Sequence, residues 1–185
     1  MLPLGTTAPD FSLLEPLTGR KVSLDEVMGE KGICIMFMCN HCPFVKHVAG
    51  ELKKVGKDLP ELGIGVVGIS ANDMENFPED NLENMAKAAK KQFSTFKYLA
   101  DESQEVAKSY KAACTPDFYI FDKDKKLKYR GKLDKSTPSN GQPVNGQYLR
   151  EAAKAIAAGQ DVKEQNPSMG CNIKWKEGNE PPYFG

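Results

Sequence analysis

The chain has 185 residues, of which 40% are hydrophobic and 27% are charged, a composition typical of a globular protein. Its 25 basic and 25 acidic residues give a formal net charge of zero, so no overall field attracts it to nucleic acid or to an anionic membrane surface. The apolar run at residues 33–38 is far too short to span a bilayer. We therefore expect a soluble protein with no nucleic-acid partner and no membrane partner. The length favours one domain over residues 1–185, with residues 160–185 as a tail packed on it.

The first half of the chain predicts strands that alternate with helices. Residues 11–13 fit a short strand and residues 24–28 one helical turn. The continuous apolar run from residue 32 to residue 38 is typical of a central strand covered on both faces. A helix follows from Pro43, and Pro60 and Gly63 end it; its apolar stripe is Val45, Val48, Leu52, Val55 and Leu59. Residues 64–70 predict a second buried strand.

The second half continues the alternation and closes with a hairpin and a helix. Residues 80–83 read as a capping box that opens a helix, because Asp80 precedes Glu83 by three positions. The remaining pattern predicts a strand at 96–99, a helix at 104–110, a hairpin of 117–121 with 126–130, and a last helix at 147–158. Residues 132–146 are rich in turn formers and long for a connection, which indicates a functional or mobile segment. This order predicts an α/β sandwich with parallel central strands and an antiparallel edge.

Five cysteines occur, and only Cys39 and Cys42 lie close together. A small secreted domain stapled by disulfides would carry a denser and even set. Residues 1–5 also lack the basic and apolar segments of a signal peptide, so we expect a cytoplasmic location. In a reducing compartment, a single Cys-x-x-Cys pair indicates redox chemistry or metal binding.

The Cys39-Asn-His-Cys42 motif lies where the apolar strand ends and the amphipathic helix begins. Free backbone amides and the helix dipole at that junction stabilise an anion, which here is a thiolate. We expect Cys39, at the outer end, to attack and Cys42, one turn inside, to resolve the mixed disulfide. His41 between them is expected to favour the thiolate as a positive charge or hydrogen-bond donor. His47 lies off the apolar stripe, so we expect it to face solvent.

Four stretches of the chain resemble the redoxin branch of the thioredoxin superfamily, which includes the alkyl hydroperoxide reductase and thiol-specific antioxidant proteins. They are Ala8-Pro-Asp-Phe-Ser-Leu13, Cys39-Asn-His-Cys-Pro-Phe-Val45, Cys114-Thr-Pro-Asp-Phe-Tyr-Ile-Phe-Asp122 and Gly170-Cys-Asn-Ile-Lys-Trp-Lys176. The resemblance covers nearly the whole chain. It implies a thioredoxin-like three-layer α/β/α sandwich with a central mixed sheet, an N-terminal extension and an irregular C-terminal tail.

The resemblance also implies a cis peptide bond before Pro116, facing the cysteine pair. In that arrangement an extended substrate would pair with the backbone of Thr115, beside Cys39. The implied activity is thiol-disulfide exchange, with protein or low-molecular-weight thiols and disulfides as partners and no organic cofactor. The alternative is a peroxidase of the redoxin type that reduces hydroperoxides. Peroxidase members carry a Pro-x-x-x-Thr/Ser-x-x-Cys signature, whereas here Cys39 stands in the Thr position and Ile35 in the Pro position.

The other cysteines leave several hypotheses open. Cys34 lies inside the predicted central strand and fits a small buried hydrophobe, and Cys114 is expected to be a buried structural thiol. Cys171 is either part of a structural tail or a third redox cysteine that reaches the active pair. A Cu(I) or Zn(II) site built from Cys39 and Cys42 with His41, His47 or Cys171 is less favoured, because structural zinc sites usually show two Cys-x-x-Cys pairs; we expect no bound metal.

Overall fold

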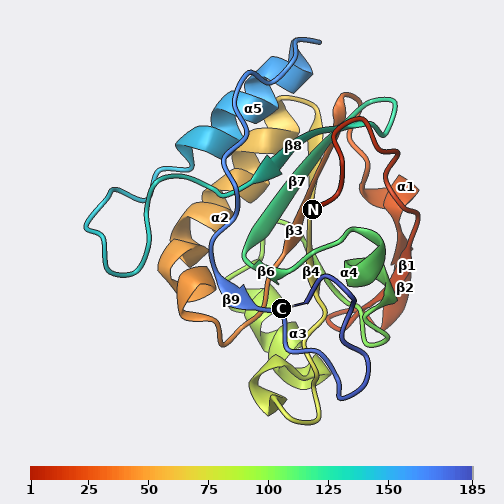
Figure 1. The fold of residues 1–185 in the computed structure, drawn as a ribbon. Helices are drawn as coiled ribbons and strands as arrows, with labels where there is room; N and C mark the ends of the chain where they lie inside the picture. The colour runs from red at the N-terminus through yellow and green to blue at the C-terminus, as the bar shows by residue number, and fades with distance from the viewer. Residues whose placement is uncertain (185) are drawn as a thin grey trace.

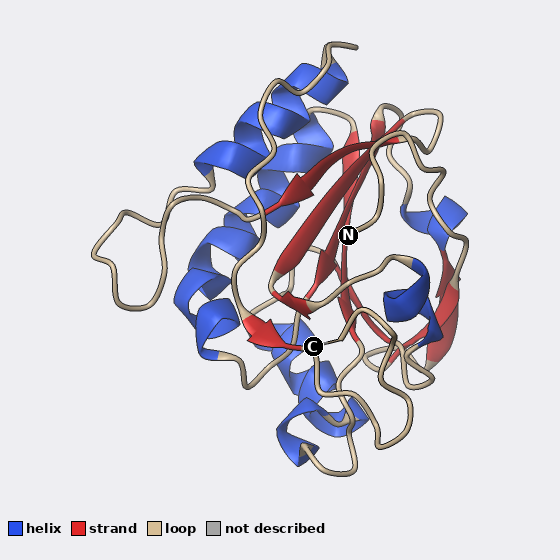
Figure 2. Ribbon diagram, viewed as in Figure 1, coloured by secondary structure: helices blue, strands red, loops and turns tan. Residues whose placement is uncertain are grey.

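A seven-stranded mixed sheet forms the centre of the molecule, as the computed structural model of the chain shows (Figures 1 and 2). The model describes residues 1–184, and the order across the sheet is β2-β1-β5-β4-β3-β7-β8. The strands of this sheet are β1 (Ser12–Glu15), β2 (Arg20–Ser23), β3 (Gly32–Phe37), β4 (Ile64–Ser70), β5 (Lys97–Ala100), β7 (Asp117–Asp122) and β8 (Leu127–Gly131). The helices are α1 (Leu24–Val27), α2 (Pro43–Glu61), α3 (Leu82–Lys91), α4 (Glu105–Ser109) and α5 (Gln147–Ala157), with a 3₁₀ turn η1 (Pro78–Asp80).

The centre of the sheet is parallel and its edges are antiparallel, as the sequence predicted. Strand β3 runs parallel to β4, and β4 runs parallel to β5. Strands β7 and β8 on one side, and β1 and β2 on the other, add antiparallel pairs. All six residues of β3 are buried, because helices or loops cover both faces of the central strands.

Two layers cover the sheet, so the expected three-layer sandwich is confirmed. Figure 1 shows α2 and α5 on one side and α1 and α4 on the other. The apolar stripe of α2 packs into the first core cluster together with residues of α3 and α5. The N-terminal segment, α1, α4 and the end of the tail fill the second cluster on the opposite face. Within residues 1–184, no helix combines the length and the apolar character that crossing a membrane requires.

The start of α3 differs from the sequence prediction. Asn81, not Asp80, caps this helix, because its side chain accepts a hydrogen bond from the amide of Asn84. Asp80 belongs to the preceding 3₁₀ turn, and its carboxylate is fully buried. The capping-box prediction was therefore wrong at Asp80, because its side chain binds residues 40 and 41 and does not cap α3.

The segment at residues 132–146 contains no helix or strand and projects beside α2 (Figure 1). A single buried carboxylate, that of Asp134, ties its two ends together. One oxygen accepts hydrogen bonds from the amide and hydroxyl of Ser136, and the other accepts from the amides of Asn145 and Gly146. The base of this loop is thus fixed directly before α5 begins.

The tail after α5 returns across the molecule to the end of the sheet at which α2 begins. There β9 (Cys171–Asn172) pairs antiparallel with β6 (Cys114–Thr115), and the amide of Ile173 donates to the carbonyl of Ala113. Ile173 and Trp175 are buried in the second core cluster. The approach of this strand requires glycine at position 170, because a Cβ atom there would lie 2.0 Å from the Thr115 carbonyl oxygen.

We therefore expect the substitution Gly170→Ala to loosen β9. The added methyl group overlaps a backbone atom, so the free energy of unfolding should fall by about 1–3 kcal/mol and hydrogen exchange at residues 171–173 should accelerate. Gly50→Ala is the matched control, because Gly50 lies on the exposed side of α2 with open space around it. That change should raise stability by up to about 1 kcal/mol. Equal exchange rates in the two variants would show that position 170 does not constrain the tail.

Candidate redox site

Cys39 and Cys42, separated by Asn40 and His41, lie between the end of β3 and the start of α2. Strand β3 ends at Phe37, and Cys42 is the N-cap residue of α2, with Pro43 in its first turn. Only 1% of Cys39 and none of Cys42 is exposed. The strand-to-helix junction predicted from the sequence is therefore present, but both cysteines are covered.

Thr115 contacts the sulfur atoms of both Cys39 and Cys42. The Sγ atom of Cys39 lies 3.6 Å from the hydroxyl of Thr115, and the thiol of Cys42 donates to the Thr115 carbonyl at 3.2 Å. The Thr115–Pro116 peptide bond is cis, as the family resemblance implied. The structure thus brings together Cys39, Cys42, Thr115 and Pro116. The backbone edge at Thr115, however, is already paired with the chain's own Cys171.

Interaction between the two neighbouring thiols links their ionisation. It is the main cause that lowers the pKa of Cys42 and raises the pKa of Cys39. Burial and the nearby Asp80 carboxylate raise the pKa of Cys39 further. The contact of Cys42 with the Thr115 carbonyl acts in the opposite sense, since only a protonated thiol can donate to it. The pair therefore stabilises one thiolate as a unit, while its two sulfurs compete for the remaining proton.

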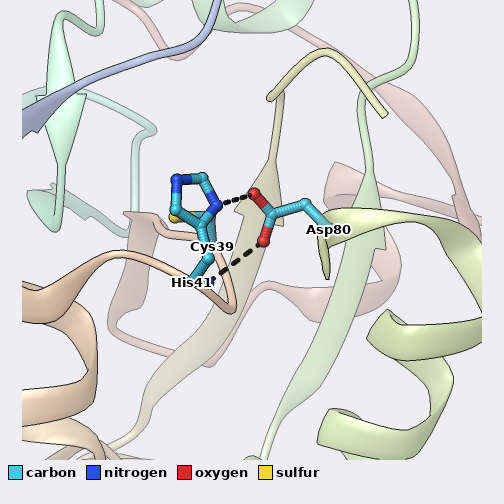
Figure 3. Close-up of side chains that lie close together, drawn as sticks. All are labelled: Cys39, His41 and Asp80. Carbon is cyan, nitrogen blue, oxygen red and sulfur yellow. Dashed lines mark hydrogen bonds and ion pairs between the residues drawn. The ribbon is translucent and has the colours of Figure 1, made fainter. Parts of the chain in front are cut away.

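Asp80 holds the Asn40-His41 turn between the cysteines (Figure 3). One carboxylate oxygen accepts from the amides of Asn40, at 2.6 Å, and His41, at 3.3 Å. The other lies 2.5 Å from Nδ1 of His41 and accepts from the Asn72 side chain at 2.8 Å. The His41 ring also stacks on Phe77, with ring centroids 5.6 Å apart. These contacts fix the spacer of the motif in one conformation.

His41 lies beside Cys39, but it does not act there alone. A ring nitrogen of His41, a carboxylate oxygen of Asp80 and the sulfur of Cys39 lie within 4.8 Å of one another. Any positive charge on His41 is therefore opposed by Asp80, which disfavours the Cys39 thiolate. Sequence reasoning missed this role, because the local pattern around Asp80 indicates a helix cap and gives no sign of a contact with residues 39 positions earlier.

His47 does not face solvent as predicted. It is half-buried, and its Nε2 atom is buried without a hydrogen-bond partner among the described residues. The reason is tertiary: the loop at residues 132–137 and Met169 fold over this side of α2 and enclose a cavity of about 20 Å³ beside Pro116. His47 is therefore separate from the Cys39–His41–Asp80 cluster.

The three other cysteines lie at different depths. Cys34 is fully buried inside β3, as predicted, and burial raises the pKa of its thiol. Cys114 is half-buried in β6, less covered than a core thiol, and burial again raises its pKa. Cys171 is half-buried opposite Thr115, and burial, followed by the nearby Cys42, raises the pKa of its thiol. All five cysteines are free thiols in this structure.

The cluster of Cys39, His41 and Asp80 fits a metal ion poorly. Cys39, His41 and Asp80 are near enough to share one, yet four hydrogen bonds already engage the carboxylate oxygens. The imidazole nitrogen nearest Asp80 is one of those four partners, so binding would break the contacts that shape the turn. His47, another ligand considered from the sequence, lies outside this cluster. The arrangement is better suited to thiol chemistry.

The model of the AhpC/TSA family matches residues 4–130. An uncharacterized conserved protein from Geobacillus kaustophilus is 51% identical, with a TM-score of 0.92 over 95% of this chain and 94% of that one. A hypothetical protein from Sinorhizobium meliloti is 41% identical, with a TM-score of 0.92 over 96% and 97%. The thioredoxin domain of a thiol-disulfide oxidoreductase from Bacteroides vulgatus has a TM-score of 0.57 at 22% identity, over 69% and 86%, which shows a shared thioredoxin-like fold alone. None of the curated proteins matches the chain.

The geometry predicts that Asp80 raises the pKa of Cys39. In a Cys42→Ser background, Asp80→Asn should lower that pKa by about one unit, because it removes a negative charge near the sulfur. The pH dependence of the thiolate ultraviolet absorbance measures this shift. Asp73→Asn is the control, because Asp73 is also buried but binds only amides and a side chain of its own loop. An equal shift of the Cys39 pKa in Asp80→Asn and Asp73→Asn would contradict a direct effect of the Asp80 charge on Cys39.

Proposed function

The chain belongs to the AhpC/TSA family, and from that premise we propose that it is a thiol-disulfide oxidoreductase that works with Cys39 and Cys42. The observation that carries the proposal is the buried pair of cysteines at the start of α2, both in contact with Thr115, in which interaction with Cys39 lowers the pKa of Cys42. Thr115 supports it from the other side, since its hydroxyl can donate to a thiolate on Cys39. Thiolate character is what makes a cysteine reactive in disulfide exchange.

In the proposed exchange, a proton moves between Cys39 and Cys42 as each sulfur reacts in turn. Cys39 attacks one sulfur of a substrate disulfide, its proton passes to the Cys42 thiolate, and the first substrate thiolate leaves. That leaving group takes the proton back from Cys42. Cys42 then attacks the sulfur of Cys39, and the second substrate thiolate leaves and takes up a proton from solvent. The products are a Cys39–Cys42 disulfide and the two thiols of the reduced substrate; the reverse sequence oxidises a dithiol.

The roles of the neighbouring residues follow from the same contacts. Asp80 and His41 hold the turn between the cysteines, so they position Cys39, while the cis Thr115–Pro116 segment lines the pair. The partners are protein or low-molecular-weight thiols and disulfides. No step requires an organic cofactor or a metal. We place the protein in a reducing compartment, for which the cytoplasm is our expectation from the sequence.

The assignment of attack to Cys39 predicts where a substrate is trapped. In a Cys171→Ser background, which removes the neighbouring third thiol, Cys42→Ser should accumulate a mixed disulfide on Cys39 when treated with glutathione disulfide. Cys39→Ser should form none and should lose disulfide exchange, because the attacking sulfur is absent. Mass spectrometry of the intact chain and of its peptides measures both outcomes.

A mixed disulfide on Cys42 in the Cys39→Ser chain would show that Cys42, and not Cys39, is the attacking cysteine.

A parallel reaction with hydrogen peroxide tests the rival activity. If the reduced protein reacts much faster with peroxide than with glutathione disulfide, and a sulfenic acid forms on either cysteine, the protein is a redoxin-type peroxidase instead. Slow oxidation by peroxide, with rapid formation of the Cys39–Cys42 bond from the disulfide, supports the oxidoreductase.

A further inference from the structure

We propose that Cys171 is a third exchanging cysteine, which takes the disulfide from the Cys39–Cys42 pair and presents it to external thiols. The inference rests on the proposed function and adds to it a role for the tail. Strand β9 lies along the backbone edge of Thr115, where an extended substrate was expected to pair. The tail therefore places a cysteine of the chain itself where the cysteine of a substrate would lie.

The pairing of β6 with β9 places Cys171 beside the residue that the Cys42 thiol contacts. The sulfur of Cys42 lies 3.2 Å from the carbonyl oxygen of Thr115, and Cys171 is the residue paired with Thr115 across the two-stranded ladder. After burial, the nearby Cys42 is the next cause that raises the pKa of Cys171. Cys171 also packs against the core cluster that contains both buried cysteines.

Exposure distinguishes Cys171 from the pair. Cys39 and Cys42 are 1% and 0% exposed, so an external thiol reaches either sulfur less readily than it reaches Cys171. Cys171 is half-buried and is the more accessible partner of Cys42. A disulfide between Cys42 and Cys171 would therefore be more open to attack from outside than one between Cys39 and Cys42.

The tail is fixed on both sides of Cys171, which keeps the two sulfurs close. Before it, the Ser168 hydroxyl donates to the buried Asp117 at 2.5 Å. After it, the backbone of Lys174 accepts from Gln104 and from the amide of Asp73 and donates to Asn72. An exchange partner held in this way has a high effective concentration, so an intramolecular transfer can outpace reaction with a free thiol.

The transfer needs no added oxidant. Cys171 loses its proton to solvent and attacks the Cys42 sulfur of the Cys39–Cys42 disulfide. The bond between Cys39 and Cys42 breaks, a Cys42–Cys171 bond forms, and Cys39 leaves as a thiolate that takes up a proton. An external thiolate then attacks the Cys171 sulfur and releases Cys42, whose lowered pKa makes it a good leaving group. A second external thiol reduces the mixed disulfide on Cys171 and completes the two-electron reduction.

Peptide mapping of the full-length chain tests the transfer directly. Trypsin, which cuts after lysine, releases residues 32–46 with Cys34, Cys39 and Cys42, residues 164–174 with Cys171, and residues 112–123 with Cys114. A Cys39–Cys42 bond stays within one peptide, whereas a Cys42–Cys171 bond joins two. After treatment with glutathione disulfide and acid quenching, we expect the joined peptides 32–46 and 164–174 in the wild type and in Cys114→Ser, but not in Cys39→Ser, where no Cys39–Cys42 disulfide can form to be passed on. Cys114→Ser is the matched control, because Cys114 is also half-buried in the same two-stranded ladder.

The second measurement is the rate at which glutathione reduces the oxidised protein. Cys171→Ser should slow this reduction on the order of tenfold, while Cys114→Ser should leave it unchanged. An internal bond in residues 32–46 as the only disulfide of the wild type, together with a wild-type rate in Cys171→Ser, would overturn the transfer and leave the proposed function intact. Failure of every protein to form any disulfide would overturn both.

Discussion

Thr115 brings together three parts of the chain that are distant in sequence. Its hydroxyl lies against Cys39, its carbonyl accepts from the thiol of Cys42, and its backbone pairs with Cys171. Two of these three contacts use main-chain atoms, which no substitution at position 115 removes. The geometry of the sulfur cluster therefore depends on the path of the backbone between β6 and β7, while the side chain of Thr115 adds a contact with Cys39.

Asp80 also constrains the turn at residues 40–41, but its charge disfavours a thiolate on Cys39. A buried carboxylate is stable only where hydrogen bonds replace its water, and here four donors from the 40–41 turn and from Asn72 do so. The same negative charge lies near Cys39 and disfavours a thiolate on that sulfur. The turn is thus held in shape by a group that moves the anionic character of the pair toward Cys42. Positioning and electrostatic activation oppose each other at this site.

The fold could be predicted from the sequence where the signal is local and periodic. The apolar run of β3, the stripe of α2 and the hairpin of β7 and β8 each lie within one window of the chain, and they are present with nearly the predicted bounds. The Cys-x-x-Cys pair was found because it stands at the junction of two such elements. Asp80 and His47 were misjudged for the opposite reason. Their surroundings come from segments 39 to 122 residues away, and no local pattern encodes those contacts.

Trp175, the only tryptophan of the chain, lies four positions after Cys171 and is 8% exposed in the second core cluster. It belongs to the tail but is buried against the body, so its surroundings exist only while residues 171–175 are docked. The emission spectrum of an indole depends on the polarity around it. The molecule therefore carries one intrinsic fluorophore that reports, without any label, whether its last strand is seated beside the sulfur atoms.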